Sequence, residues 1–139
     1  TESLLRKKNF FIPKVCRSAI SAYKYNLKTE FGNIDIYREW NWCEDQCEIL
    51  IKFLKKEPQD FVLSNGKCLS GKKMLQYAFE YFKLDYKKYM KINKKLLRPS
   101  KTSNLIGDTT KAYKTFGFKP KTKIKKLIEI MMKNELNNS

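Results

Sequence analysis

Apolar side chains recur three and four positions apart along four parts of the chain, the spacing that gives a helix one buried face. The pattern predicts helices over residues 13–27, 42–56 and 70–84, and a last helix after residue 122. Pro13 suits the first turn of its helix, and Pro58 ends the second helix. Ser70 and Thr122 are the expected N-caps of the third and last helices. The last helix carries an apolar stripe formed by Ile124, Leu127, Ile128 and Met131.

Short extended segments separate these helices. The apolar and aromatic content of the chain predicts them at residues 31–38, 60–63 and 89–92. The second is followed by Asn65-Gly66, a pair typical of a tight turn. A further short helix is predicted from a cap at Asp108 to a left-handed Gly117. Strands this few and short do not make an independent parallel sheet, so the pattern predicts a mostly helical lobe that packs against another domain.

The composition is that of one globular domain with a strongly basic surface. The chain has 139 residues, is 42% hydrophobic and carries a net charge of +16. A polyanionic partner would explain the charge, and the lysine-rich segment 86–101 with its tyrosines is the candidate for binding single-stranded nucleic acid. A compositional bias is the alternative, because only four of the 30 basic residues are arginine. We regard nucleic acid as the weaker interpretation.

Membrane and metal chemistry have little support in the sequence. No apolar run approaches the roughly 20 residues that span a bilayer, and no secretory signal pattern opens the chain, so a cytoplasmic protein is expected. The four cysteines form no C-x-x-C pair and there is no histidine, so no metal site is expected. Cys43 and Cys47 lie four apart and would share a helix face. We expect all four to be free thiols, buried or partly buried, in a reducing compartment.

The sequence contains no recognisable catalytic group. None of the five glycines fits a phosphate-binding loop, and the absence of histidine removes the commonest general base, so no catalytic residue is assigned. Arginine remains, and its planar guanidinium suits bidentate contact with phosphate. Arg38 stands out because it ends an extended segment just before a helix, in the triplet Arg38-Glu39-Trp40. The alternative interpretation of residues 31–45 is a hairpin with solvated charges.

Four segments match, in order and with nearly the same spacing, motifs of one enzyme family. Residues 1–15, TESLLRKKNFFIPKV, are similar to HESPRRGxxFVTRKI, and residues 32–40, GNIDIYREW, to GNxDxxRDW. Residues 58–66, PQDFVLSNG, resemble P-x-D-[FY]-V-[IL]-A-T-G. Residues 97–120 resemble FRPxExxxLLGDxxKAxxxLGWKP. The chain therefore resembles the C-terminal part of the GDP-mannose 4,6-dehydratases, extended short-chain dehydrogenase/reductases of the NAD-dependent epimerase/dehydratase group.

The resemblance implies an α/β fold in which this chain is the mostly helical C-terminal substrate-binding lobe, with short strands, of an extended Rossmann-type dehydratase. It implies that Arg6 lies against NADP, and that Lys14, Arg38 and Arg98 bind the nucleotide sugar, GDP-mannose or a related one. Family chemistry is oxidation at C4 by NADP, loss of water across C5 and C6, and return of the hydride at C6. Family members are commonly dimers or tetramers, which implies a homo-oligomer for the parent enzyme.

The same resemblance implies that residues 1–139 are one C-terminal portion, without the N-terminal Rossmann domain. The glycine-rich cofactor turn and the Tyr-x-x-x-Lys pair of the family belong to that missing part. Thr1 replaces the family's cofactor-facing His, and Lys101 stands where the family has a substrate-contacting Glu, which reverses a charge beside the nucleotide sugar. The alternatives are a truncated, non-catalytic paralogue and a partner that docks onto a dehydratase subunit.

Overall fold

The computed structural model describes residues 1–97 and 105–138 and is mixed helix and strand. Its helices are α1 (Phe11–Tyr25), α2 (Cys43–Phe53), α3 (Gly71–Glu80), α4 (Tyr86–Tyr89), α5 (Thr110–Phe116) and α6 (Ile124–Asn137), with a 3-10 helix η1 (Lys94–Leu96). Its strands are β1 (Thr29–Phe31), β2 (Tyr37–Glu39), β3 (Cys68–Ser70) and β4 (Met90–Ile92). β1 pairs with β4 in parallel, and β2 pairs with β3 antiparallel. In the described part of the chain the strands therefore form two separate pairs and no larger sheet.

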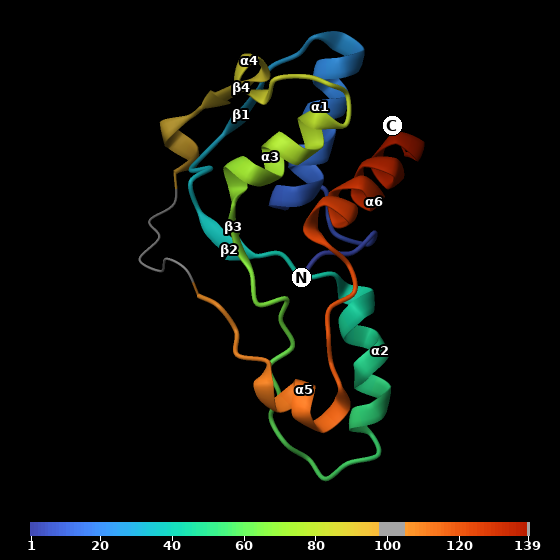
Figure 1. The fold of residues 1–139 in the computed structure, drawn as a ribbon. Coiled ribbons are helices and arrows are strands. Elements are labelled where there is room, and N and C mark those ends of the chain that lie inside the picture. The colour runs from blue at the N-terminus through green and yellow to red at the C-terminus, as the bar shows by residue number, and fades with distance from the viewer. Residues whose placement is uncertain (98–104, 139) are drawn as a thin grey trace.

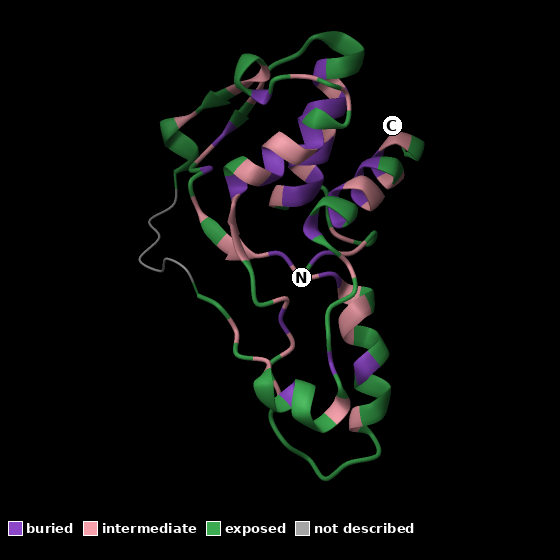
Figure 2. Cartoon of the chain, viewed as in Figure 1, coloured by how far each residue is buried: buried purple, intermediate pink, exposed green. Residues whose placement is uncertain are grey.

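The main hydrophobic core lies between α1, α3 and α6 (Figure 1). The apolar stripe predicted for the last helix faces this core, since Leu127 and Met131 are fully buried and Ile128 is 1% exposed. Buried residues concentrate on these three helices, whereas the opposite end of the molecule is mostly exposed (Figure 2). None of the helices within residues 1–97 and 105–138 is long and apolar enough to cross a membrane.

α2 and α5 form a second, smaller packing unit at the opposite end of the molecule from the main core (Figure 1). Its buried residues are Ile49, Ala112 and Phe118, with Phe53, Phe61, Leu63 and Phe116 packed against them. The rings of Phe53 and Phe116 lie 4.6 Å apart between centroids, and that of Phe61 lies 4.9 Å from Phe116. Aromatic contacts between distant segments therefore hold this end together.

Residues 60–63, predicted as a strand, form none. Phe61 and Leu63 pack into the α2–α5 unit instead, and the Leu63 carbonyl accepts a hydrogen bond from Gln46 Nε2 at 2.8 Å. The strand of this region is β3, which follows the left-handed Gly66 at φ 65°. The extended segment 31–38 likewise divides into the end of β1 and the start of β2, because the Asn33 side chain accepts from the Asp35 amide and forms a turn.

Of the three predicted N-caps, Ser70 is confirmed and Thr122 is wrong, while Asp108 lies one residue before Thr109, the N-cap of α5. Ser70 Oγ accepts a hydrogen bond from the Lys73 amide at 3.2 Å, at the start of α3. Lys123 occupies the N-cap position of α6 and makes no side-chain cap bond. The Thr122 hydroxyl instead donates to Asp45 on α2, a partner 77 positions away that a local pattern does not indicate.

Candidate functional site

Phe11, in the first turn of α1, brings together the segments that carry two of the predicted ligand residues. Its ring meets the edge of Phe31, at the end of β1, with centroids 6.2 Å apart, and stacks on Trp40, just after β2, at 5.5 Å. Gly71 lies against the same ring, and a Cβ there would stand only 2.7 Å from Phe11 Cζ. The starts of α1 and α3 and the ends of β1 and β2 therefore meet around one side chain.

Lys14 lies one turn beyond Phe10 in α1 and is half-buried. Its ammonium Nζ lies 4.9 Å from the centroid of the Phe31 ring, a cation–π arrangement. This contact holds the amine at the end of β1, on the aromatic group that also includes Phe11 and Trp40. A lysine in this position presents a cation beside the chain segment that leads to Arg38.

Arg38 is the central residue of β2, opposite Leu69 of β3, and is half-buried. Its Nη1 donates to the Tyr37 carbonyl at 2.9 Å. Because side chains alternate along an extended strand, Arg38 shares its face with Trp40, while Glu39 points to the other face. Trp40 is held in turn by a 3.0 Å bond from its Nε1 to the Leu69 carbonyl. The strand pairing and the buried indole therefore fix the backbone that carries the guanidinium.

Arg6 lies in the segment before α1. Its guanidinium stacks on the Phe10 ring with Cζ 3.7 Å from the centroid, and its Nε lies 3.6 Å from Glu2 Oε2. Burial raises the pKa of Glu2, and the Arg6 charge acts in the opposite direction. The segment is anchored by a short parallel bridge, since the Glu2 amide donates to Asn41 and its carbonyl accepts from Cys43. Arg6 is thus tied to residues that directly follow the Arg38 triplet.

Glu39 connects chain segments around Arg38 through contacts that the sequence did not indicate. Its carboxylate accepts hydrogen bonds from the Ser64 hydroxyl and from the Gly107 amide, the latter at 3.2 Å. A Cβ at Gly107 would lie 2.8 Å from Val62 Cγ1 and 2.9 Å from Ser64 Cβ, so only glycine fits this close approach. Glu39 therefore connects β2 to two segments that are remote in sequence.

Arg98 and Lys101 lie outside the described residues, so the structure gives no position for either. The residues on both sides of them are described and both contact segment 31–39. On one side Leu96 lies against Gly32, where a Cβ would be 2.3 Å from the Leu96 carbonyl oxygen. On the other side Gly107 donates to Glu39. Both ends of the segment that contains Arg98 are thus held at the stretch that contains Arg38.

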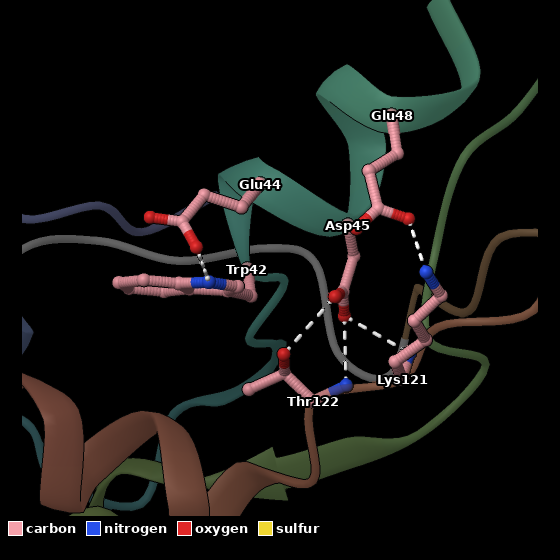
Figure 3. Close-up of polar contacts among 6 residues, drawn as sticks. All are labelled: Trp42, Glu44, Asp45, Glu48, Lys121 and Thr122. Carbon is pink, nitrogen blue, oxygen red and sulfur yellow. Dashed lines mark hydrogen bonds and ion pairs between the residues drawn. The ribbon is translucent and has the colours of Figure 1, made fainter.

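A second carboxylate, Asp45, joins α2 to the entry of α6 (Figure 3). It accepts from the amides of Lys121 and Thr122 at 3.1 and 2.8 Å and from the Thr122 hydroxyl at 3.0 Å. Glu48, one turn further along α2, pairs with the Lys121 ammonium, and Trp42 Nε1 donates to Glu44 at 3.1 Å (Figure 3). This network positions the smaller unit against the main core.

The cysteines are free, and in the described part of the chain no group of three or more Cys, Asp or Glu side chains is arranged to hold a metal ion. Cys16 is fully buried, and Cys43 and Cys68 are half-buried. Cys47 is exposed, which corrects the expectation that every thiol would be at least partly buried. Cys47 lies on α2, a helix of the smaller packing unit. Most residues of this helix are exposed, and Ile49 is its buried member.

Sequence comparison places these features in one family. The family model for GDP-mannose 4,6 dehydratase matches residues 1–131. GDP-mannose 4,6 dehydratase 1 of Arabidopsis thaliana is 34% identical over 138 residues, which cover 97% of this chain and 38% of that protein. The human GDP-mannose 4,6 dehydratase is 27% identical over 150 residues, covering 94% of this chain and 40% of that protein. The chain therefore spans about two fifths of the length of these relatives.

Solved structures give the same fold. The RMD protein of Pseudomonas aeruginosa, complexed with NADPH, superposes with a TM-score of 0.84 at 14% identity over 96% of this chain and 45% of that one. The dTDP-glucose 4,6-dehydratase of Bacillus anthracis, in complex with NAD, gives a TM-score of 0.80 at 14% identity, over 96% and 41%. The predicted fold class, a mostly helical lobe of a Rossmann-type dehydratase, is confirmed. Together with the four ordered motifs, these matches show that the chain belongs to the GDP-mannose 4,6-dehydratase family.

Proposed function

We propose that residues 1–139 form the C-terminal, nucleotide-sugar-binding portion of a GDP-mannose 4,6-dehydratase, a lyase that converts GDP-mannose to GDP-4-keto-6-deoxymannose. In this proposal a Rossmann domain outside this chain supplies the cofactor turn and the catalytic acid–base groups. The family match over residues 1–131 supports it. The parent enzyme would be a cytoplasmic homo-oligomer, as the family resemblance implies.

The observation that carries the proposal is the meeting of the segments that carry Lys14 and Arg38, together with the described residues on either side of Arg98. The first turn of α1 contacts the ends of β1 and β2 through Phe11, and both flanks of residues 98–104 contact segment 31–39. Lys14 and Arg38 therefore belong to chain segments that converge, and Arg98 lies in the sequence between Leu96 and Gly107, which both contact segment 31–39. Cations such as Lys14 and Arg38 suit a diphosphate, since each phosphate oxygen accepts charge-assisted hydrogen bonds.

In the proposed roles, Arg38 binds the diphosphate with its planar guanidinium and Lys14 contributes a point charge. Arg98 contacts the nucleotide sugar, and Arg6 faces the cofactor. NADP would supply the hydride transfer of this chemistry, and Arg6 is the residue of this chain that would help to hold it. This chain holds the sugar nucleotide and orients it. Because Lys101 stands where the family has a Glu, the identity of the sugar nucleotide is tested directly by assay.

A chimera tests the proposal. The corresponding C-terminal portion of Arabidopsis thaliana GDP-mannose 4,6 dehydratase 1 is replaced by this chain, and conversion of GDP-mannose in the presence of NADP is followed. We expect turnover, and we expect Arg38→Ala to raise KM about 10–100-fold, the loss of one or two charge-assisted bonds. Arg38→Lys, which keeps the charge but not the fork of donors, should recover only part of that loss.

Lys28→Ala is the matched control, because Lys28 is an exposed lysine outside the converging segments and should leave KM unchanged. A folded chimera that binds NADP but does not convert GDP-mannose would overturn the assignment of substrate. Titration of the isolated 139-residue chain with GDP-mannose should give weak or no binding, because the other part of the site lies outside it. The relatives named above are dehydratases and give no support to the nucleic-acid alternative.

A further inference from the structure

Two thiols face each other on the first turns of α2. Cys43 Sγ and Cys47 Sγ lie 3.7 Å apart, in contact through a weak S–H···S hydrogen bond. Cys47 is exposed and Cys43 is half-buried, so solvent reaches the former more readily. The proposed function uses neither thiol.

The other two cysteines lack these properties. Cys16 is fully buried in the main core, and burial raises its pKa far above the ordinary range, with Glu135 and Glu2 adding to the effect. It therefore remains a thiol at neutral pH and is shielded from reagents. Cys68 is half-buried in β3, where its backbone is opposite Glu39. Of the four cysteines, 43 and 47 are the two in mutual sulfur contact.

Helix geometry allows these two thiols to be joined with a local change only. Residues four apart in an ideal α-helix have Cα atoms about 6.2 Å apart, within the roughly 4.4–6.8 Å range of disulfides. Their Cβ atoms are about 5–6 Å apart and must approach by about 1–2 Å. Cys43 is the first residue of α2, so the deformation falls on the first turn, where the Cys43 amide donates to the Glu2 carbonyl and Asp45 accepts from the Lys121 and Thr122 amides.

We propose that Cys43 and Cys47 form an oxidisable dithiol, in which a hydroperoxide oxidises Cys47 and Cys43 closes the disulfide. The Cys47 thiolate attacks the terminal peroxide oxygen and the O–O bond breaks, giving the sulfenic acid. The released alkoxide or hydroxide takes up a proton from solvent and leaves as an alcohol or, from hydrogen peroxide, as water. The Cys43 sulfur then attacks the sulfenic sulfur, an S–S bond forms, and the hydroxyl leaves as water with the Cys43 proton. Per disulfide, one peroxide is reduced and two thiols are oxidised.

The modification would act on the contact between the two packing units. Asp45 lies between the two cysteines in the same turn, and its carboxylate holds Lys121 and Thr122 at the entry of α6 (Figure 3). Closing a disulfide across this turn changes the backbone that carries Asp45. The dithiol is therefore placed where its oxidation weakens the attachment of α2 to α6.

Trypsin makes the test direct, because it separates the four cysteines into three peptides. Cleavage at lysine and arginine places Cys43 and Cys47 together in residues 39–52, Cys16 in residues 15–17 and Cys68 in residues 68–72. The chain is treated with hydrogen peroxide, remaining thiols are alkylated, and the digest is measured by mass spectrometry. We expect peptide 39–52 to lose two hydrogens and to recover them with dithiothreitol, while the other two peptides are alkylated.

Single variants test the two roles separately. In Cys43→Ser the sulfenic acid of Cys47 should persist and be trapped by dimedone, and in Cys47→Ser the remaining Cys43 should stay largely reduced. Cys68→Ser is the control and should give the same disulfide as the unchanged protein. Far-UV circular dichroism of each variant establishes that it is folded. Cross-linking of peptide 39–52 to 68–72, or oxygen addition at 39–52 without hydrogen loss, would overturn the proposal.

Discussion

Asp45 shows how much one carboxylate contributes when its partners are backbone amides distant in sequence. It accepts three hydrogen bonds from Lys121 and Thr122, and it lies in the first turn of α2, where the helix dipole favours a negative charge. Glu48 on the same helix pairs with the Lys121 side chain, but both groups are more than half exposed. Asp45 and Glu48 thus contact the same segment, but Asp45 is bonded to backbone amides and a hydroxyl and is half-buried, whereas Glu48 pairs with an exposed ammonium group.

We predict that Asp45→Ala lowers the free energy of unfolding by about 2–3 kcal/mol, because amides that were bonded to a charged acceptor lose it. Glu48→Ala is the matched control and should leave stability almost unchanged, since exposed ion pairs contribute little. Urea unfolding followed by tryptophan fluorescence measures both. Equal effects of the two substitutions would show that the contact acts through charge rather than through directed hydrogen bonds.

At the scale of the element, α5 is held at its start by a residue one position before its N-cap. Thr109 occupies the N-cap position without a side-chain cap bond, while Asp108 Oδ1 accepts from the Thr110 amide at 2.8 Å. The sequence predicted that the Asp108 carboxylate accepts an amide of the first turn, and it does. The N-cap position itself is occupied by Thr109, one residue later. Gly117 ends the helix with φ 69°, the left-handed conformation predicted for it.

This cap predicts a pH dependence for α5. Hydrogen bonds from the Thr110 hydroxyl and amide lower the pKa of Asp108 below its ordinary value. A carboxyl group whose pKa is lower in the folded state stabilises at pH above its unfolded pKa, and that contribution is lost as pH falls through the folded pKa. The Thr110 amide resonance should therefore titrate in the acid range below about pH 4.

Asp108→Asn should remove that titration, whereas Glu57→Gln, at an exposed position away from α5 in sequence, should preserve it. Two-dimensional amide NMR between acid and neutral pH gives the readout. A Thr110 resonance that stays constant across this range in the unchanged protein would contradict the cap assignment.

At the scale of the whole molecule, the chain consists of a large core and a small one. α1, α3 and α6 enclose the first, and among the described residues the buried members of the second are Ile49, Ala112 and Phe118. Since stability against local opening follows the amount of buried apolar contact, the two parts should open with different free energies. The Asp45 network and the Glu39 bonds connect them.

We predict that backbone amides of α2 and α5 exchange with deuterium faster than those of α1, α3 and α6. Asp45→Ala should widen this difference by accelerating α2 and the entry of α6 while leaving α1 and α3 unchanged. Hydrogen–deuterium exchange with mass spectrometry measures each helix separately. Uniform exchange across all five helices would mean that the described residues open as a single cooperative unit.

The local pattern of the sequence determined the elements that depend on neighbours in the chain. The helices of the main core, the Ser70 cap and the left-handed Gly117 follow from side chains a few positions apart, because helix periodicity and caps are short-range. The ordered motifs determined the family. They also named Lys14, Arg38, Arg98 and Arg6, whose roles stay predictions.

Only the tertiary structure decided which distant segments meet. Residues 60–63 form no strand, and Phe61 and Leu63 pack into the α2–α5 unit instead. Thr122 does not cap α6, and its hydroxyl donates to Asp45 instead. The bond from Gly107 to Glu39 joins residues 68 positions apart. Such contacts depend on how whole helices and strands pack against one another. A hydrophobic periodicity that extends over one or two helical turns carries no information about them.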